Sequence, residues 1–150
     1  MKVLLVIDVQ EKYLCYYDAD LLSRINARIA TAKSDRDPIF YIRNIGIHGD
    51  NASYALAKDL LIASDHIYEK RFSSAFTNDS FAKELKDLKV TELEIIGVDG
   101  NSCVKKTCLE AVNIGYRVTL NLQCTSARNK NIFDKTLKEL SDAGVIMLNT

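Results

Sequence analysis

The sequence predicts an α/β protein with three layers, in which a doubly wound, mostly parallel sheet of six strands lies between helices. Short β-branched and aliphatic runs alternate with helical patterns along the whole chain, and this alternation favours a parallel sheet covered on both faces. Right-handed crossovers leave a doubly wound order as the expected topology. The 150 residues suit one domain, 1–150, and a chain of that size buries roughly 68–70% of its unfolded surface without a disulfide or metal.

Six segments are predicted as strands because apolar and β-branched residues dominate them. The first, VLLVI, contains no polar residue, which is typical of a strand buried on both faces. Pro38 separates the first predicted helix from the second strand, because it disfavours the helical conformation at Asp37. The predicted strands are residues 3–7, 39–42, 66–69, 93–98, 117–122 and 145–148.

Five segments are predicted as helices because their apolar residues recur at helical spacing. Asn78 or Asp79 is expected to cap the third of them. Gly115 and Gly144 directly follow the fourth and fifth, at the position where a left-handed residue ends many helices. The predicted helices are residues 21–32, 52–63 (the weakest pattern), 79–88, 102–114 and 129–143.

Charge and apolar patterning argue against several classes of protein. Basic and acidic residues number 20 each, so the formal net charge is zero, and no basic stripe indicates a nucleic-acid or membrane-surface partner. The first apolar run ends at Asp8 without a small-residue cleavage site, so no signal peptide is expected. No run approaches the roughly 18 apolar residues of a membrane span. A cytoplasmic location is therefore expected, in which the four cysteines are thiols.

Reactive side chains follow three of the predicted strands, at the sheet edge where such folds bind ligands. Asp8 closes the first strand, Lys70 follows the third and Cys103 follows the fourth. A carboxylate after an apolar strand needs a partner or a polar cavity, although such an acid taken alone is more often a loop cap. Lys70 taken alone is an ordinary residue of a charged loop, but beside a thiol it favours the thiolate.

Cys103 lies in the first turn of the predicted helix 102–114. Unpaired backbone N–H groups and the helix dipole favour a thiolate there, and the same N–H groups can bind an oxyanion. The alternative is a small buried apolar residue, which is how most unpaired cysteines behave. Cys108 and Cys124 lack such a setting and are interpreted as structural, and Cys15 as a packing residue. No C-x-x-C pair indicates a zinc or thioredoxin-type site.

Three stretches, in this order, resemble the isochorismatase-like hydrolases, a family that includes nicotinamidases and N-carbamoylsarcosine amidases. They are LLVIDVQ (4–10), K-x-x-x-S-A-F (70–76) and GVDGNSCVKKTCLEAVNIGYRV (97–118). Each motif alone is weak, but the three together at one sheet edge are fairly specific. The order of predicted elements matches the family over nearly the whole chain.

The resemblance implies a catalytic trio. Asp8 looks like the family's general base, Lys70 like its second catalytic residue and Cys103 like its nucleophile. The family often has a cis peptide four residues before the cysteine, which here joins Val98 to Asp99. Such a bond would direct the Asp99 N–H, together with that of Cys103, at one oxyanion.

The candidate pocket residues are Gln10 and Phe76, which lie in these motifs, and Tyr13, which follows the first of them. The short chain leaves little for a lid, and residues 45–61 are the expected cover. The family often forms dimers or tetramers, so a homo-oligomer is expected by analogy. Asp99 departs from the small neutral residue that is usual there, and it is expected either to point away from the cleft or to alter the charge preference for substrate.

Metal-dependent nicotinamidases carry an acid and histidines after the second strand. Here that region reads YIRNIGIHGDN, with Asn44 and Gly46 where ligands are expected, so the sequence predicts no catalytic metal, no cofactor, and a substrate other than nicotinamide. His48 and His66 are not spaced as a metal pair. A Cys-His triad would need one of them at the carboxyl edge, and only His48 follows a strand.

The resulting hypothesis is hydrolysis of a C–N bond in a small amide or ureido compound through a Cys103 thioester. The presence of this cysteine argues against vinyl-ether hydrolysis, because true isochorismatases lack it. Two other classes remain open: an inactive protein of the same fold, and a binding module of flavodoxin or receiver type. The loop after the first strand, DVQEKY, contains no glycine and therefore lacks a dinucleotide-binding pattern.

Overall fold

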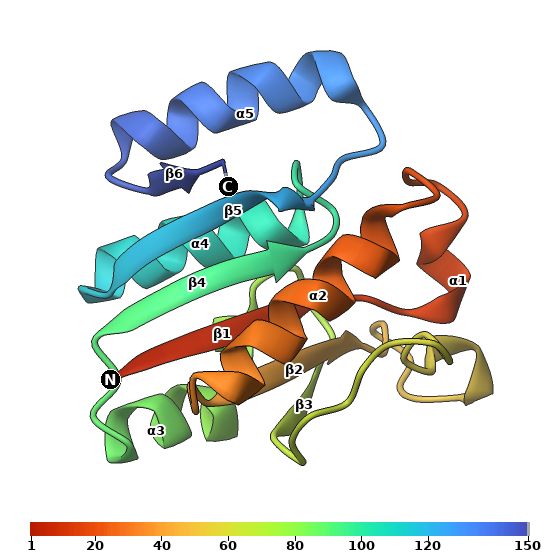
Figure 1. Cartoon of the computed structure of the whole chain (residues 1–150), viewed down its shortest axis with the longest axis horizontal. Coiled ribbons are helices and arrows are strands. Elements are labelled where there is room, and N and C mark those ends of the chain that lie inside the picture. Colours follow the sequence, from red (N-terminus) through yellow and green to blue (C-terminus); the bar gives the residue numbers. More distant parts are fainter. Residues whose placement is uncertain (150) are drawn as a thin grey trace.

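The computed structural model describes residues 1–149 and contains a six-stranded sheet between helices (Figure 1). The strand order is β3-β2-β1-β4-β5-β6 and every strand pairing is parallel, which confirms the predicted fold class. Chain order reverses between β1 and β4, so the carboxyl ends of these central strands form the switch point where ligands bind in such folds. The strands are β1 (Lys2–Ile7), β2 (Ile39–Asn44), β3 (Ile67–Lys70), β4 (Glu92–Gly97), β5 (Arg117–Thr125) and β6 (Ile146–Leu148).

Helices cover the two faces of the sheet unequally. The helix α2 packs on one face, and the short helix α1 lies at the carboxyl edge of the strands (Figure 1). The helices α3, α4 and α5 cover the other face. No helix within residues 1–149 is long and apolar enough to cross a membrane. The helices are α1 (Glu11–Leu14), α2 (Leu21–Ser34), α3 (Asp79–Asp87), α4 (Cys103–Ile114) and α5 (Lys130–Asp142).

The apolar first strand is buried on both faces, as its composition predicts. Leu4 and Val6 pack into the cluster beneath α2, whereas Val3, Leu5 and Ile7 belong to the cluster on the opposite face. All five are at most 1% exposed. Burial of each such side chain contributes about 1.5–3 kcal/mol, so the central strands form a rigid base for the residues at their ends.

The predicted helix over residues 52–63 is wrong. Only Ala52–Tyr54 forms a single 3₁₀ turn; Leu56 then bridges antiparallel to Gln10, and a further turn follows at residues 58–60. Ala57 donates its N–H to the Val9 carbonyl at 3.0 Å. Ala57 and Leu60 of this segment are buried by pairing with the loop after β1 and by packing near α2, whereas Ile62 stays 46% exposed, so tertiary contacts override the weak helical spacing.

Candidate active site

The structure brings together the three residues predicted to be catalytic. Lys70 Nζ lies 3.0 Å from Asp8 Oδ2 and 3.3 Å from Cys103 Sγ. Asp8 follows β1, Lys70 ends β3 and Cys103 begins α4. Because β2 lies between β1 and β3, a long side chain is needed at position 70 to reach across the edge of the sheet.

Asp8 stands at a sharp turn directly after β1. Its φ of +53° is in the left-handed region, which is uncommon for a residue other than glycine. The backbone is fixed by hydrogen bonds from the Asp8 N–H to the Ile42 carbonyl and from the Gln10 N–H to the Asp8 carbonyl. The side-chain Oδ1 is buried and has no hydrogen-bond partner among residues 1–149. An unsatisfied buried acceptor is rare, and it suits an atom that takes a proton from a bound molecule.

Burial controls the protonation of this cluster. Burial raises the pKa of Asp8 above its ordinary value, while the Lys70 cation and hydrogen bonding oppose the rise. Burial, and next the Asp8 charge, raise the pKa of Cys103 to about 11, although Lys70 opposes this. Burial and the Asp8 charge therefore outweigh the opposing effect of Lys70 on the pKa of the thiol. Cys103 rests as a thiol beside a carboxylate that can accept its proton.

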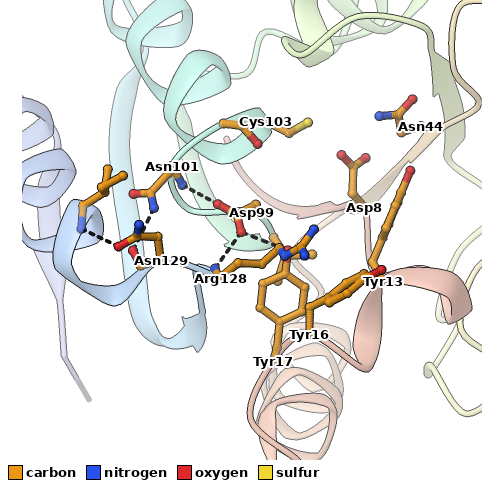
Figure 2. A pocket seen from close by; sticks show the side chains of 13 residues that line it. Asp8, Tyr13, Tyr16, Tyr17, Asn44, Asp99, Asn101, Cys103, Arg128 and Asn129 are labelled. Atoms are coloured by element: carbon orange, nitrogen blue, oxygen red, sulfur yellow. Dashed lines mark hydrogen bonds between the residues drawn. The ribbon is translucent and has the colours of Figure 1, made fainter.

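A cavity of about 410 Å³ opens onto Asp8 and Cys103 (Figure 2). The loop 98–103 forms one part of its wall, and Tyr13 from α1 forms another. Burial raises the pKa of Tyr13 to about 12, so its phenol stays neutral and can donate or accept a hydrogen bond. This volume lies within the usual range of about 300–1,000 Å³ for small-molecule sites.

Of the three predicted pocket residues, Tyr13 lines the cavity and the other two do not. Gln10 is fully buried and its amide bonds to the backbone of Asn44. Phe76 is 7% exposed and its ring lies 5.3 Å from that of Phe81, within the core. Gln10 and Phe76 therefore pack behind the cavity and support its wall, and they do not line it.

The Asp99 carboxylate ties three segments together, as Figure 2 shows. It accepts hydrogen bonds from Tyr17 Oη at 3.0 Å, from the Arg128 N–H at 2.8 Å and from the Asn101 N–H at 2.8 Å. Asp99 therefore lines the cavity with a carboxylate that accepts three hydrogen bonds. It does not simply point away from the cleft, which is one of the two alternatives that the sequence left open. Burial and the neighbouring Asp99 charge raise the pKa of Tyr17, which keeps this phenol protonated.

The loop before Cys103 has the predicted backbone form. The Val98–Asp99 peptide is cis. In the part of the chain that the structure describes, neither the Asp99 N–H nor the Cys103 N–H donates a hydrogen bond to protein. Both N–H groups belong to residues that line the cavity, and Cys103 is the first residue of α4, where helical N–H groups lack internal partners.

Three further cavity residues carry no signal in the sequence: Tyr16, Tyr17 and Arg128. The Arg128 guanidinium lies over the Tyr16 ring, 3.7 Å from its centroid, and forms no ion pair within residues 1–149. The tyrosines follow α1 and Arg128 precedes α5. Only the fold brings these segments together, and no spacing rule relates them.

At the end of β2, where an acidic metal ligand is expected in metal-dependent nicotinamidases, this chain has Asn44. Among residues 1–149, no three His, Cys, Asp or Glu side chains gather in a way that could hold a metal ion. Asn44 Oδ1 accepts a hydrogen bond from the Gly46 N–H at 2.8 Å. His66 stacks on Phe40 with ring centroids 4.5 Å apart, at the opposite end of the strands.

A family model described as an isochorismatase domain matches residues 2–150. The chain therefore belongs to the isochorismatase family, as the three motifs indicate. Nicotinamidase 3 of Arabidopsis thaliana is 32% identical over 77 residues, which make up 51% of this chain and 39% of that protein. The match thus spans about two fifths of the length of this relative.

Solved structures have the same fold. A pyrazinamidase of Pyrococcus horikoshii in complex with zinc has a TM-score of 0.88 and 20% identity, with 99% of each chain covered. An isochorismatase-like hydrolase from Alkaliphilus metalliredigens has a TM-score of 0.86 and 19% identity, with 99% of this chain and 91% of that one covered. A nicotinamidase from Staphylococcus aureus has a TM-score of 0.84 and 18% identity, with coverages of 99% and 98%. At these identities the likeness concerns the fold alone.

Proposed function

We propose that this protein is a cysteine hydrolase that cleaves a C–N bond of a small amide or ureido compound through a Cys103 thioester. The observation that carries the proposal is the buried cluster in which one ammonium, Lys70 Nζ, contacts both the Asp8 carboxylate and the Cys103 thiol beside a small-molecule cavity. A nucleophile, a base and an orienting group within hydrogen-bond reach are the usual requirements of covalent catalysis.

In the first step, Asp8 takes the Cys103 proton as the thiol sulfur attacks the carbonyl carbon. Asp8 suits this role because burial raises its pKa toward that of the thiol. Its Oδ1 also has no hydrogen-bond partner within residues 1–149 and can therefore accept the proton. The C–N bond then breaks, protonated Asp8 delivers its proton to the departing nitrogen, and ammonia or an amine leaves. Lys70 holds the carboxylate in place.

In the second step, water attacks the thioester. Asp8 accepts one proton of this water as the new C–O bond forms, and the C–S bond then breaks. The proton returns to the sulfur, and the carboxylic acid (a carbamic acid if the substrate is a urea) leaves. The site regains its starting protonation, so Asp8 acts as base and acid in turn, as microscopic reversibility requires.

Both steps pass through a tetrahedral intermediate that carries an oxyanion. The N–H groups of Asp99 and Cys103 are the proposed donors to it, because both residues line the cavity and neither N–H donates to protein within the described chain. One such donor contributes roughly 2.7–4 kcal/mol to transition-state stabilisation in other acyl-transfer enzymes. The position at the start of α4 adds the favourable end of the helix dipole.

The cavity suits a small, partly aromatic substrate. Three tyrosines line it (Tyr13, Tyr16 and Tyr17), and Arg128 is its one cation without an ionic partner among residues 1–149. These groups favour a planar acyl group that is neutral or anionic. The names of the relatives, a nicotinamidase and a pyrazinamidase, support a primary carboxamide as the reacting group.

A screen for ammonia release tests the proposal. Wild-type protein is incubated with a panel of primary carboxamides and ureido compounds, and the acyl-enzyme is sought by intact mass after acid quench. At least one compound is expected to release ammonia and to add its acyl mass to the peptide that contains Cys103. Cys103→Ala should abolish both signals, while Cys15→Ala, which changes an exposed thiol, should leave them intact. Equal losses in the two variants, or turnover in Cys103→Ala, would refute the assignment.

A further inference from the structure

We infer that Asn44 determines specificity at this site, by donating a side-chain N–H hydrogen bond to an acceptor atom that the substrate carries close to the scissile carbonyl. The inference rests on the proposed function and narrows its substrate class. The favoured substrates are amides in which a ring nitrogen or a second carbonyl oxygen lies within a few bonds of the reacting amide. Simple hydrocarbon amides of the same size are disfavoured.

Asn44 stands among the reacting groups without taking part in their contacts. It is the last residue of β2, and its register partner in β3 is Lys70. The strand β2 also borders β1, which leads to Asp8. Asn44 lines the same cavity as Asp8 and Cys103, so its side chain faces the volume in which a substrate of Cys103 would lie.

A buried amide holds the Asn44 backbone in place. Gln10 Nε2 donates to the Asn44 carbonyl at 2.9 Å, and the Asn44 N–H donates to Gln10 Oε1 at 2.7 Å. Gln10 Nε2 also donates to the Tyr54 carbonyl at 2.8 Å, and Gln10 is fully buried. This pairing continues the hydrogen bonding beyond the end of β2, so the site does not depend on a flexible loop to position residue 44.

A second hydrogen bond fixes which way the Asn44 amide faces. Its Oδ1 accepts from the Gly46 N–H at 2.8 Å. Because a backbone N–H can only donate, the atom that it meets must be the amide oxygen. The amide nitrogen then faces the other way, and Figure 2 shows it on the side of Asp8 and Cys103. Within residues 1–149, Nδ2 donates no hydrogen bond.

The site therefore presents an oriented donor beside an oriented acceptor. Asp8 Oδ1 is the acceptor without a partner. In the proposed reaction it accepts a hydrogen bond or proton from the substrate N–H or from the thiol. Asn44 Nδ2 is the donor, and nothing in the proposed reaction uses it. A bound molecule without an acceptor at this place would leave a desolvated N–H unpaired, and sites built to bind a polar atom reject analogues that lack it.

Aldehydes test this inference without knowledge of the natural substrate. The Cys103 thiol adds to an aldehyde carbonyl, the new C–S bond forms, and the proton goes to the oxygen, so the hemithioacetal resembles the first tetrahedral intermediate. Benzaldehyde and the three pyridine carbaldehydes (2-, 3- and 4-substituted) have the same shape and differ by one ring nitrogen. Their dissociation constants are measured by protection of Cys103 from iodoacetamide, read by peptide mass.

The expected result is that wild-type protein prefers at least one pyridine carbaldehyde over benzaldehyde, and that Asn44→Leu reduces this ratio three- to tenfold, the range of one neutral hydrogen bond. Asn44→Asp, which keeps an acceptor for the Gly46 N–H, should reduce it as well. Comparing this ratio between variants cancels the intrinsic reactivity of each aldehyde. It also cancels any change in the reactivity of Cys103 that affects all four aldehydes equally. Asn113→Leu, at an exposed position on α4 outside this cavity, is the matched control and should keep the wild-type ratio.

The outcomes separate this inference from the proposed function. If benzaldehyde protects Cys103 equally in all variants and the pyridine preference survives in both Asn44 variants, Asn44 has no part in specificity and the hydrolase proposal stands. If no aldehyde protects Cys103 in the wild type, the acyl-transfer site itself is refuted, and the role of Asn44 with it.

Discussion

The ammonium of Lys70 and the carboxylate of Asp8 form an ion pair of 3.0 Å in which the two side chains are 0% and 3% exposed. Buried ion pairs contribute little net stability, because both partners lose their hydration. Their removal is costly only when one charge is left alone. Placed against a cysteine, this pair is therefore better explained by chemistry than by stability, and each partner has a separate, measurable effect on Cys103.

Replacing Asp8 by Asn is expected to lower turnover and to speed the alkylation of Cys103. Turnover should fall about 10²- to 10⁴-fold, the usual contribution of general acid–base catalysis. Meanwhile the pKa of Cys103 should fall from about 11, because a raising charge is lost while Lys70 remains. Iodoacetamide should then alkylate Cys103 faster at pH 8 than in the wild type. The exposed Cys15 in the same chain is the internal reference, and slower alkylation of Cys103 relative to Cys15 would contradict the assignment.

Replacing Lys70 by Met is expected to shift the pH dependence of turnover. The Lys70 charge lowers the pKa of Asp8, so its loss raises that pKa further. Because the reaction needs Asp8 as a carboxylate, the acidic limb of kcat/KM against pH should move to higher pH. The pKa of Cys103 should also rise above about 11. Lys106→Met, at an exposed lysine of α4, should leave the profile in place, and an unmoved acidic limb in Lys70→Met would exclude electrostatic coupling to Asp8.

The catalytic cluster could be predicted from sequence because each member stands at the end of a clearly patterned element. The run VLLVI indicates a central strand, and the next residue must then lie at the sheet edge. Asn78 and Gly115 mark helix boundaries by local chemistry, and the structure confirms both, with Asn78 Oδ1 accepting from the Phe81 N–H and Gly115 at a φ of +119°. Such signals are local, so one chain suffices to read them.

The remainder of the site depends on contacts that no local pattern encodes. Arg128 joins the cavity by lying over Tyr16, a residue from the other end of the chain. The helix predicted at 52–63 is absent because that segment pairs with the loop after β1. The pKa of Cys103 could not be predicted either: it depends on how deeply the thiol is buried, and sequence shows only which charges are near.

Loss of the Asp99 carboxylate is expected to weaken the wall of the cavity. Asp99→Ala removes the acceptor of Tyr17, Arg128 and Asn101, and hydrogen bonds to a charged group contribute about 1.5–3 kcal/mol each. Asp99→Ala keeps the backbone N–H that is a proposed oxyanion donor, but it removes the contacts that hold this loop in place, so kcat/KM should fall at least about tenfold. Tyr17→Phe removes only one of the three bonds and should have a smaller effect. A larger loss in Tyr17→Phe than in Asp99→Ala would show that Tyr17 contacts the substrate directly.

The buried Glu94 is expected to link stability to pH far from the active site. It is 2% exposed and accepts hydrogen bonds from Arg28 at 2.7 and 2.8 Å and from Asn121 at 3.1 Å. Although burial alone would raise its pKa, these partners together lower the pKa of Glu94 from 4.5 to about 2. A depressed folded-state pKa stabilises the fold above about 4.5, and this contribution is lost as pH falls toward about 2.

The measurable consequence is a pH-dependent cost of Glu94→Gln. At pH 7 the free energy of unfolding in urea should fall by about 3 kcal/mol, the equivalent of this pKa difference. The gap between variant and wild type should narrow steadily as pH falls from about 4.5, where wild-type Glu94 begins to lose its advantage. The control is Glu139→Gln, at a residue whose side chain is 58% exposed and pairs with Lys105. It should lower the free energy of unfolding by less than about 1 kcal/mol throughout this pH range. A constant gap for Glu94→Gln across this range would show that its charge is not involved.

Gly97 and Gly115 form a matched pair that separates backbone strain from close packing. Both have φ near +118°, at +117° and +119°, but a Cβ at Gly97 would lie 2.1 Å from the Ile7 carbonyl oxygen, whereas a Cβ at Gly115 would meet no atom within 4 Å. Gly115→Ala is therefore expected to cost about 1–2 kcal/mol, the strain of a left-handed conformation. Gly97→Ala must also separate β4 from β1, and it should cost about 1–3 kcal/mol more or prevent folding. Because Gly97 directly precedes the Val98–Asp99 peptide, any folded Gly97→Ala protein should also lose turnover, while Gly115→Ala keeps it. Urea unfolding and ammonia release measure the two effects, and equal costs at the two glycines would show that β1 and β4 can separate without penalty at the edge that carries Asp8.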